Sequence, residues 1–284
     1  MSSETQASRP GYQLSDEELH SVWQVQLDLI RQVQTICEKN DITFNMVGGT
    51  MLGAIRHKGY IPWDDDADIG FLREEYEKFR EACRTDLDHE KYELQDFRDT
   101  PGYRWGYGKL RRKNTEYIRL NQEFMPYSQG IFIDLMPFDN VPDGPLQRKW
   151  HFFRCFLFRK TFWSEVGYRN EKNAFYRMLY FFLHLLPEKN VKKQFERFIT
   201  KGEKYENSRL VRILTFPTPK GCPGYKREWY EQLADYSFED MKLPGAADYD
   251  GYLTCKYGEY MKLPPVAKRK VHPISKLTLP ENNL

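Results

Sequence analysis

The 284-residue sequence has few cysteines and no pattern among them. The five cysteines stand at positions 37, 83, 155, 222 and 255, and no two form a C-x-x-C pair. This scarcity excludes a disulfide framework or a zinc knuckle as the basis of the fold, and it favours a reducing, cytoplasmic environment. The first thirteen residues lack an apolar segment, so we expect no signal peptide.

Long apolar runs and an excess of charge of one sign are also missing. The most apolar stretch, residues 174–187, is shorter than a bilayer span and contains Arg177 and His184, so we expect no transmembrane helix. The formal net charge is only +2, from 43 basic and 41 acidic side chains. Without a strong positive field or a recognised nucleic-acid-binding module, nucleic acid is not an expected partner.

Positive charge is concentrated in the middle of the chain. Residues 148–204 hold 14 Lys or Arg and five Glu, a local charge of +9, and include the aromatic runs 150–163 and 175–187. Basic, aromatic helices are typical of peripheral contact with anionic lipid, here at the cytoplasmic face of the inner membrane. The same pattern equally fits helices that pack on a sheet and leave a basic side in water.

Hydrophobic periodicity predicts an α+β protein with a mixed sheet flanked by helices. A capping box between Ser15 and Glu18 starts a helix that continues to about Lys39. The segment 130–138 is the most apolar strand and should be central. Further strands are expected at 42–47, 67–72, 92–97, 107–113 and 115–120, and short helices at 48–57, 73–83 and 249–257. Residues 1–13 are expected to form a flexible tail and residues 14–284 a single domain, with a helical, basic and aromatic sub-region at about 144–204.

The stretch GYIPWDDDADIG, residues 59–70, places four aspartates in five positions. Two unit charges about 5 Å apart repel by about 3 kcal/mol at an effective dielectric constant of 20. Asp66 and Asp68 alternate with apolar residues, so in a strand their carboxylates share one face. They are therefore predicted ligands of a divalent cation, Mg²⁺ or Mn²⁺, which would remove the repulsion. For Asp64 and Asp65 a solvated turn is the favoured interpretation.

A third carboxylate lies within the apolar segment IFIDLM. Asp134 is expensive to bury there unless a positive group satisfies it, so it is either a third metal ligand or the partner of an internal arginine. With Asp66 and Asp68 it would complete the set that metal-assisted phosphoryl or nucleotidyl transfer uses. A carboxylate near both metal and acceptor can also serve as general base, and Asp134 is the candidate.

A glycine-rich turn precedes the acidic stretch. Gly48, Gly49 and Thr50 follow a strand and open a helical turn, where free N–H groups attract a phosphate. Arg56 is predicted to hold a phosphate in bidentate fashion, and His57 either helps to neutralise it or caps the turn.

Two further basic groups are candidates for contacts with an anionic ligand. Lys109 and Arg111 share one face of an alternating strand and are predicted to bind the donor, with a solvated strand edge as the alternative. The C-terminal tail either closes over the donor, contacts an anionic acceptor or is solvated; its cationic side chains are Lys268, Arg269, Lys270 and His272.

These motifs resemble those of a known family. The run GGTMLGAIRHKGYIPWDDDADIGF, residues 48–71, resembles the signature of the LicD family of phosphotransferases, which is related in motif to fukutin and fukutin-related protein. Residues 249–272, YDGYLTCKYGEYMKLPPVAKRKVH, resemble the closing block of that family. The resemblance implies a nucleotidyltransferase-like catalytic domain with a helical insertion. Ala67 stands where the family commonly has a larger apolar residue, a change not expected to disturb metal binding.

Carried onto this sequence, the family's metal carboxylates fall on Asp66 and Asp68, with Asp134 as the third, and its donor loop on residues 48–50. The resemblance implies a bacterial cell-envelope enzyme that moves a phospho-alcohol group, typically phosphocholine from CDP-choline, onto a sugar hydroxyl. The acceptor would be a lipid-linked teichoic-acid or lipopolysaccharide glycan, and CMP would leave. Ribitol phosphate, glycerol phosphate, phosphoethanolamine or aminoethylphosphonate would fit the same core.

Three questions stay open at this stage. A quaternary ammonium headgroup needs an aromatic box, and the nearby aromatic residues, each equally a candidate for core packing, are Trp63, Tyr103, Trp105 and Tyr107. A true nucleotidyltransferase, which releases pyrophosphate, would use the same fold and carboxylates. A metal- or glycan-binding module without enzymatic activity is the third alternative.

Overall fold

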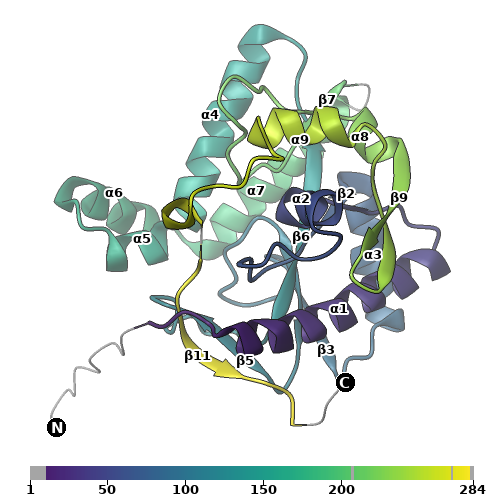
Figure 1. The fold of residues 1–284 in the computed structure, drawn as a ribbon. Coiled ribbons are helices and arrows are strands. Elements are labelled where there is room, and N and C mark those ends of the chain that lie inside the picture. Colours follow the sequence, from purple (N-terminus) through teal and green to yellow (C-terminus); the bar gives the residue numbers. More distant parts are fainter. Residues whose placement is uncertain (1–10, 206–207, 270, 282–284) are drawn as a thin grey trace, which may run out of the picture.

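The fold was analysed in a computed structural model, which describes residues 11–205, 208–269 and 271–281 (Figure 1). The helices are α1 (Asp16–Lys39), α2 (Gly48–Arg56), α3 (Arg73–Asp86), α4 (Pro145–Phe162), α5 (Ser164–Asn170), α6 (Ala174–His184), α7 (Glu188–Gly202), α8 (Glu228–Glu231) and α9 (Tyr249–Tyr257), with 3₁₀ turns η1 (Glu203–Tyr205) and η2 (Val266–Lys268). The strands are β1 (Asn45–Met46), β2 (Asp68–Leu72), β3 (Tyr92–Gln95), β4 (Gly108–Arg112), β5 (Glu116–Arg119), β6 (Phe132–Asn140), β7 (Leu210–Arg212), β8 (Tyr225–Lys226), β9 (Leu233–Phe238), β10 (Met241–Ala246) and β11 (Ile274–Thr278).

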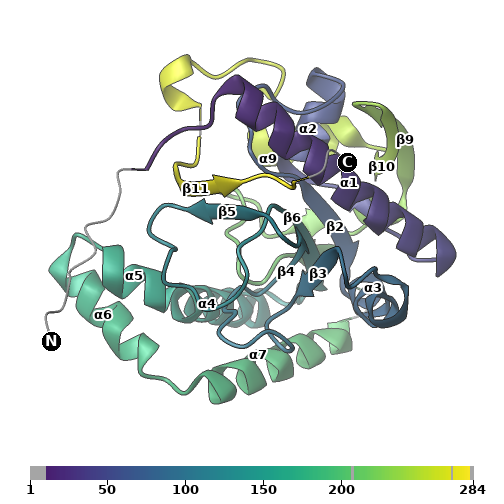
Figure 2. The same cartoon turned by 90° about the horizontal axis from the view of Figure 1, so that it is seen from below.

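The main sheet is mixed, which confirms the predicted α+β class. Its strand order is β1-β2-β6-β4-β3, and β7 and β8 continue from the far end of β6. Strand β6 runs parallel to β2 and antiparallel to β4. The apolar segment predicted to be central therefore lies between two neighbours, and eight of its nine residues are buried. Figure 2 shows α1 on one side of this sheet and α4 and α7 on the other.

Helix α1 begins where the sequence places it. The Glu18 backbone N–H donates to Ser15 Oγ at 3.2 Å and the Ser15 N–H donates to Glu18 Oε2 at 2.8 Å, which confirms the capping box. Its inner face contributes the fully buried side chains of Leu29, Ile30 and Val33 to the core around the sheet. Burial of each such side chain stabilises the fold by about 1.5–3 kcal/mol. Helix α1 is thereby fixed across β4 and β6.

The predicted helical region forms α4 to α7 and has a core of its own. Phe97, Tyr103, Phe162, Phe195 and Phe198 pack together there, separate from the main cluster. Tyr103, one of the four aromatic candidates, is fully buried in this core and donates its hydroxyl to the Tyr107 carbonyl at 3.0 Å. Within residues 11–205, 208–269 and 271–281, no helix has the length and apolar character needed to cross a bilayer.

The C-terminal region folds back on the start of the chain. Residues 115–120 form a strand as predicted, but β5 pairs with β11 in a separate two-stranded sheet. Asn114, at φ 57°, turns the chain out of the main sheet after β4. Tyr12 also pairs with Ile274 through two backbone hydrogen bonds of 2.9 Å. Tyr12, within the predicted flexible tail of residues 1–13, is therefore paired with the C-terminal region. Residues 1–10 lie outside the described part, and the tail as a whole stays a prediction.

Candidate active site

Two parallel strands bring the predicted carboxylates to one place. Asp68 is in register with Asp134 across β2 and β6. Ala67 and Ile69 are fully buried on the opposite face, while Asp66 and Asp68 are only partly buried, so the predicted alternation is confirmed. Together with Asp64, the three carboxylates line a cleft of about 810 Å³, hereafter the carboxylate cleft.

Asp134 has a cationic partner from the neighbouring strand. Lys109 lies opposite Asp134 in the β4–β6 register and forms an ion pair with Asp134 Oδ1. Burial raises the pKa of the Asp134 carboxyl, and the nearby Lys109 opposes that rise. Burial likewise lowers the pKa of Lys109 to about 8. The positive group expected beside Asp134 is therefore present, as a lysine and not as an arginine.

The sequence suggested a solvated turn at Asp65, but in the structure this residue is buried. It is 3% exposed and accepts a hydrogen bond from the Tyr117 hydroxyl. His272 Nδ1 lies 2.8 Å from Asp65 Oδ1, and the Arg119 guanidinium lies 3.8 Å from Asp65 Oδ2. Burial alone would raise the pKa of Asp65, but the hydrogen bond from His272 and the charge of Arg119 outweigh it and lower the pKa. Asp65 is therefore a buried anion with three polar partners.

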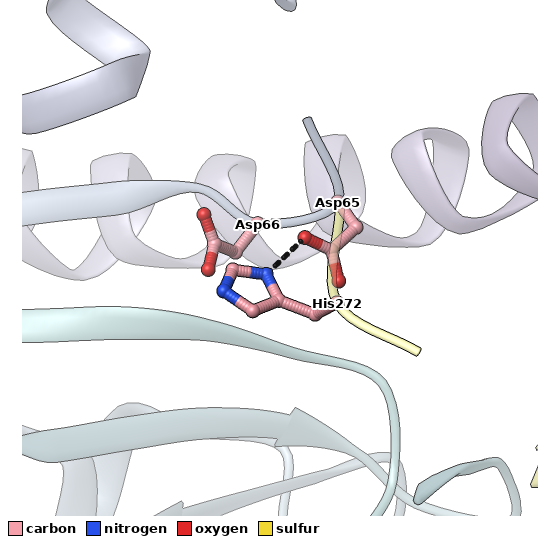
Figure 3. Close-up of side chains that lie close together, drawn as sticks. All are labelled: Asp65, Asp66 and His272. Carbon is pink, nitrogen blue, oxygen red and sulfur yellow. Dashed lines mark hydrogen bonds and ion pairs between the residues drawn. The ribbon is translucent and has the colours of Figure 1, made fainter. Parts of the chain in front are cut away.

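Asp66 lies next to this group and faces the cleft. Arg119 Nη2 binds Asp66 Oδ2 at 2.9 Å. Figure 3 shows the His272 imidazole between the carboxylates of Asp65 and Asp66. One ligand atom of each of these three residues lies within 4.8 Å of the others, so the three could hold a metal ion. The sequence pattern predicts Asp66 as a ligand, whereas it indicates His272 only as a cation of the tail.

The carboxylates of Asp64 and Asp68 are electrostatically strained. Burial, with the charges of Asp66 and Asp134, raises the pKa of Asp68 to about 8, although Lys256 and Lys109 act in the opposite direction. Burial and Asp66 also raise the pKa of Asp64. An oxygen-rich cluster that protonates this readily fits a hard divalent cation, because the ion would replace those protons and cancel the repulsion.

The glycine turn packs directly against these carboxylates. Gly48 has φ +60°, and a Cβ there would collide with Asp68 Oδ2. A Cβ on Gly49 would lie 2.6 Å from Asp64 Oδ2. Thr50 Oγ1 accepts a hydrogen bond from the Asp68 backbone N–H at 2.8 Å. The glycines thus let the start of α2 approach the cleft, and Thr50 ties that helix to β2.

The predicted cations have different surroundings. Arg56 lines the carboxylate cleft and donates to the Tyr260 carbonyl at 2.7 Å. His57 does not line it: its Nε2 accepts from Arg56 Nε at 2.9 Å, and burial, then Arg56, lowers the pKa of His57. Arg111 donates to Gln95 Oε1 at 2.6 Å and to the Gly130 carbonyl at 2.7 Å, outside the cleft.

The C-terminal tail reaches the carboxylate cleft. Arg269 stacks over Trp63, with 4.1 Å between its guanidinium carbon and the ring centroid, and Lys268 lines the cleft. Lys270 lies outside the described residues. Lys256 of α9 and Arg119 of β5 also line the cleft and were missed by sequence analysis. The resemblance of residues 249–272 marked the α9 segment, but no local pattern reveals that β5 pairs with β11.

A second cavity, of about 570 Å³, adjoins the cleft. We call it the cationic cavity, because its charged lining consists of Arg104, Lys109, Arg111, Arg119, Arg159 and Lys160. No Asp or Glu of the described residues lines it. Trp105, Tyr107 and Phe132 contribute aromatic walls, and Lys109 Nζ lies 3.4 Å from the Phe132 ring centroid. Tyr107, Arg119 and His272 line both spaces, so the cavity and the cleft meet.

Carboxylates on adjoining strands of a mixed sheet, beside a glycine-rich helix start, define the class of nucleotidyltransferase-like proteins. Residues 41–164 match the sequence model of the family described as LicD/FKTN/FKRP, nucleotidyltransferase domain. The chain is also similar to the lipopolysaccharide cholinephosphotransferase LicD of Haemophilus influenzae, with 28% identity over 255 residues, 87% of this chain and 93% of that protein. The resemblance seen in the motifs is confirmed: residues 41–164 match the nucleotidyltransferase domain of the LicD family, and most of the chain is similar to a LicD protein.

Shorter matches fall on two rickettsial proteins of uncharacterised function. The chain is 37% identical over 70 residues to a protein of Rickettsia typhi, and 39% identical over 64 residues to one of Rickettsia prowazekii. These matches cover 25% and 22% of this chain, and 21% and 23% of the two relatives. They add no further information on activity.

Proposed function

We propose that this protein transfers a phospho-alcohol group from a cytidine nucleotide to a sugar hydroxyl of a cell-surface glycan. The family domain and the likeness to a cholinephosphotransferase support a transferase of this kind. CDP-choline is the first donor to test, because that relative is a cholinephosphotransferase. The observation that carries the proposal is the junction of the carboxylate cleft with the cationic cavity.

The donor belongs in the carboxylate cleft. Asp66 and Asp68 are the residues that would hold a divalent ion, and Arg56 and Lys256 line the same space with positive charge. When bound, the ion would neutralise the donor's diphosphate oxygens and so make the phosphorus beside the headgroup more electrophilic. The start of α2 lines this space at Gly49 and is the candidate for backbone contacts with phosphate, whereas the Gly48 N–H donates to the Tyr252 hydroxyl at 2.9 Å.

The acceptor belongs in the cationic cavity. Aromatic walls suit the faces of sugar rings. Six cations line the cavity, and although Lys109 and Arg119 are paired with aspartates of the site, no Asp or Glu of the described residues lines the cavity itself, which suits a glycan that bears phosphate or carboxylate groups. The same charge makes this cavity unfavourable for a quaternary ammonium headgroup. We therefore assign the alcohol part of the donor to the cleft side of the junction, where the carboxylates of Asp64, Asp66 and Asp68 lie.

The reaction is an in-line displacement at the junction. The acceptor hydroxyl oxygen attacks the donor phosphorus next to the headgroup, a new P–O bond forms, and the P–O bond to CMP breaks. The hydroxyl proton passes to the Asp134 carboxylate, which lines the cleft while its partner Lys109 also lines the cavity. The Lys109 ammonium then stabilises charge near the reacting oxygens.

The decisive assay measures which nucleotide product appears. CDP-choline, CDP-ethanolamine, CDP-glycerol and CDP-ribitol are each incubated with the protein, Mg²⁺ or Mn²⁺ and a glycan acceptor, and phosphorus NMR follows CMP. We expect CMP from one of these donors and no pyrophosphate from CTP. Pyrophosphate from CTP would instead establish a nucleotidyltransferase, and no turnover with any donor would favour a binding module.

The carboxylates are tested with a matched control. Asp68→Asn should lower turnover at least a hundredfold, whereas Asp235→Asn, on the exposed surface of β9, should leave it unchanged. Mn²⁺ affinity measured by electron paramagnetic resonance separates the two candidate ligand sets. Weaker binding in Asp68→Asn but not in His272→Ala supports Asp66 with Asp68, and the reverse supports Asp65, Asp66 and His272.

A further inference from the structure

Helix α4 is apolar on two opposite faces. His151, Cys155 and Phe162 point into the second core and are buried. Leu146, Trp150, Phe153 and Leu157 lie on another face at helical spacing and are 40–81% exposed. A helix of a water-soluble domain normally has one apolar stripe, so the outer stripe has no partner within the described chain.

Helix α6 exposes a second apolar stripe. Tyr180 is the one residue of this helix that is buried, against α4 and α5. Phe175, Met178, Phe182 and, just after the helix, Leu186 are 44–65% exposed at helical spacing. Figure 1 shows α5 and α6 as a pair of helices that projects from the body of the molecule. Aromatic and aliphatic side chains gathered in this way are the usual mark of an interaction surface.

The two stripes belong to one surface. A groove of about 410 Å³ between α4 and α7 is lined by Trp150 and Leu157 from the first stripe and by Leu186 from the second. Phe158 and Val191 form its floor, and Arg154 is the charged residue that lines it. We call this surface, made of the two stripes and the groove, the apolar platform.

Positive charge surrounds the apolar platform. Lys149, Arg177, Lys189, Lys193 and Arg197 are exposed on α4, α6 and α7. The acidic side chains of this region are largely neutralised within the fold: Glu165 pairs with Arg169, Glu188 with Lys192, and Glu196 with Arg98. Two copies of such a surface would repel each other, whereas an anionic bilayer would attract it.

We propose that the apolar platform docks on the surface of an anionic lipid bilayer. The exposed Trp, Phe and Leu side chains would enter the interface between headgroups and acyl chains, and the surrounding cations would contact lipid phosphates. Helices α4 and α6 also provide Arg159, Lys160 and Tyr180 to the cationic cavity. The docked surface thus lies on the same helices as the cavity proposed for the acceptor, which suits an acceptor carried on a lipid.

Vesicle co-sedimentation of the full chain tests the docking. We expect at least tenfold stronger partition into phosphatidylcholine vesicles with 30% phosphatidylglycerol than into pure phosphatidylcholine, and weaker partition at high salt. Phe182→Glu and Trp150→Glu should each lower partition at least tenfold. Val266→Glu, at a residue 73% exposed on η2 and outside the platform, is the matched control and should bind as the wild type does.

Two other measurements keep the outcome unambiguous. Phe182 and Trp150 line neither the cleft nor the cationic cavity, so both variants should keep the wild-type melting temperature and the wild-type CMP release with a soluble acceptor. Equal binding of wild type and platform variants would overturn the proposal. So would a wild-type dimer, seen by light scattering, that both variants convert to monomer while none of the proteins binds vesicles, because the platform would then join two copies of the chain.

Discussion

At the scale of single residues, the acidic stretch is tolerable because each carboxylate has a different environment. Asp65 is held as an anion by Tyr117, His272 and Arg119, whereas Asp68 holds a proton more tightly because it is shielded from water beside the charges of Asp66 and Asp134. A cluster of this kind stores repulsion that a divalent ion releases on binding. The buried contacts of Asp65 therefore exclude a solvated turn at that residue, and the cluster as a whole could hold a metal ion.

Substitution of Gly48 should lower both the stability of the protein and its activity. In Gly48→Ala, the positive φ and the contact with Asp68 both oppose the methyl group, so we expect a loss of about 1–2 kcal/mol of unfolding free energy and at least a tenfold fall in CMP release. Urea unfolding and the CMP assay measure the two effects. Gly202→Ala is the control, because a Cβ there meets no atom within 4 Å; an equal loss in both variants would contradict the argument.

His151 should make stability depend on pH. Burial, with Arg212 and Arg154 nearby, lowers its pKa from 6.5 to about 3, and its Nε2 has no hydrogen-bond partner among the described residues. Below pH 6.5 the His151 imidazole binds a proton in the unfolded chain but stays neutral in the folded protein. The stability present above pH 6.5 is therefore lost as the pH falls towards 3. Between pH 7 and pH 5 this amounts to about 2 kcal/mol.

The measurement is the free energy of unfolding in urea at pH 7 and pH 5. Replacement by leucine, His151→Leu, should reduce the difference between the two pH values by about 2 kcal/mol. His89→Leu, at an exposed histidine, should leave the difference at its wild-type value. If His151→Leu behaves as His89→Leu does, His151 is charged in the folded protein.

At the scale of elements, the pairing of β5 with β11 completes the site. Strand β5 carries Arg119, and the chain just before β11 carries His272, so one two-stranded sheet places both side chains beside Asp65 and Asp66. Ile274 anchors that sheet, because it is fully buried with Val22, Val25 and Phe132. The site thus depends on packing between the two ends of the chain.

Removing that anchor should therefore affect both stability and catalysis. Ile274→Ala should cost about 2–4 kcal/mol of unfolding free energy and should lower CMP release more than a global loss of folded protein explains. Differential scanning fluorimetry measures the loss of stability. Turnover at 15 °C, where the variant remains folded, measures the loss of catalysis separately. Lys276→Ala, at an exposed position of the same strand, is the control. It should change the unfolding free energy by no more than about 0.5 kcal/mol and CMP release by no more than about twofold.

At the scale of the whole molecule, a cleft lined by both acids and bases meets a cavity whose charged lining is basic. The carboxylate cleft gathers acids from β2 and β6, while the cationic cavity gathers bases from β4, β5 and α4. Such a separation allows one ligand to bind through a metal ion and the other through direct ion pairs. The transferable group would lie between them.

This arrangement predicts that acceptor and donor binding can be weakened separately. Arg159→Gln, in the cationic cavity but outside the cleft, should raise the KM for an anionic glycan acceptor about five- to twentyfold and leave the KM for the CDP-linked donor unchanged. Steady-state kinetics with each substrate varied in turn gives both constants. Lys149→Gln, exposed on the same helix, should alter neither; an increase in donor KM alone would place the donor in the cationic cavity.

Elements whose causes are local could be predicted from the order of the residues alone. The capping box fixed the start of α1, alternation with Ala67 and Ile69 fixed the face shared by Asp66 and Asp68, and the apolar run fixed β6 at the centre of the sheet. Motifs at residues 48–71 were also enough to indicate the family. These features depend on residues a few positions apart, and such patterns are preserved in the linear chain.

The distant residues that complete the candidate site could not be predicted in this way, because the folding of the chain brings them together. Lys109 as the partner of Asp134, Arg119 and His272 beside Asp65, and the cavity without carboxylates all arise from contacts between segments far apart in the sequence. The exposure of the apolar stripes on α4 and α6 was equally undetermined, because the same periodicity fits a helix packed on a sheet. The pattern of residues along the chain predicts which side chains share one face of a helix or strand. Contacts between distant segments determine what that face packs against.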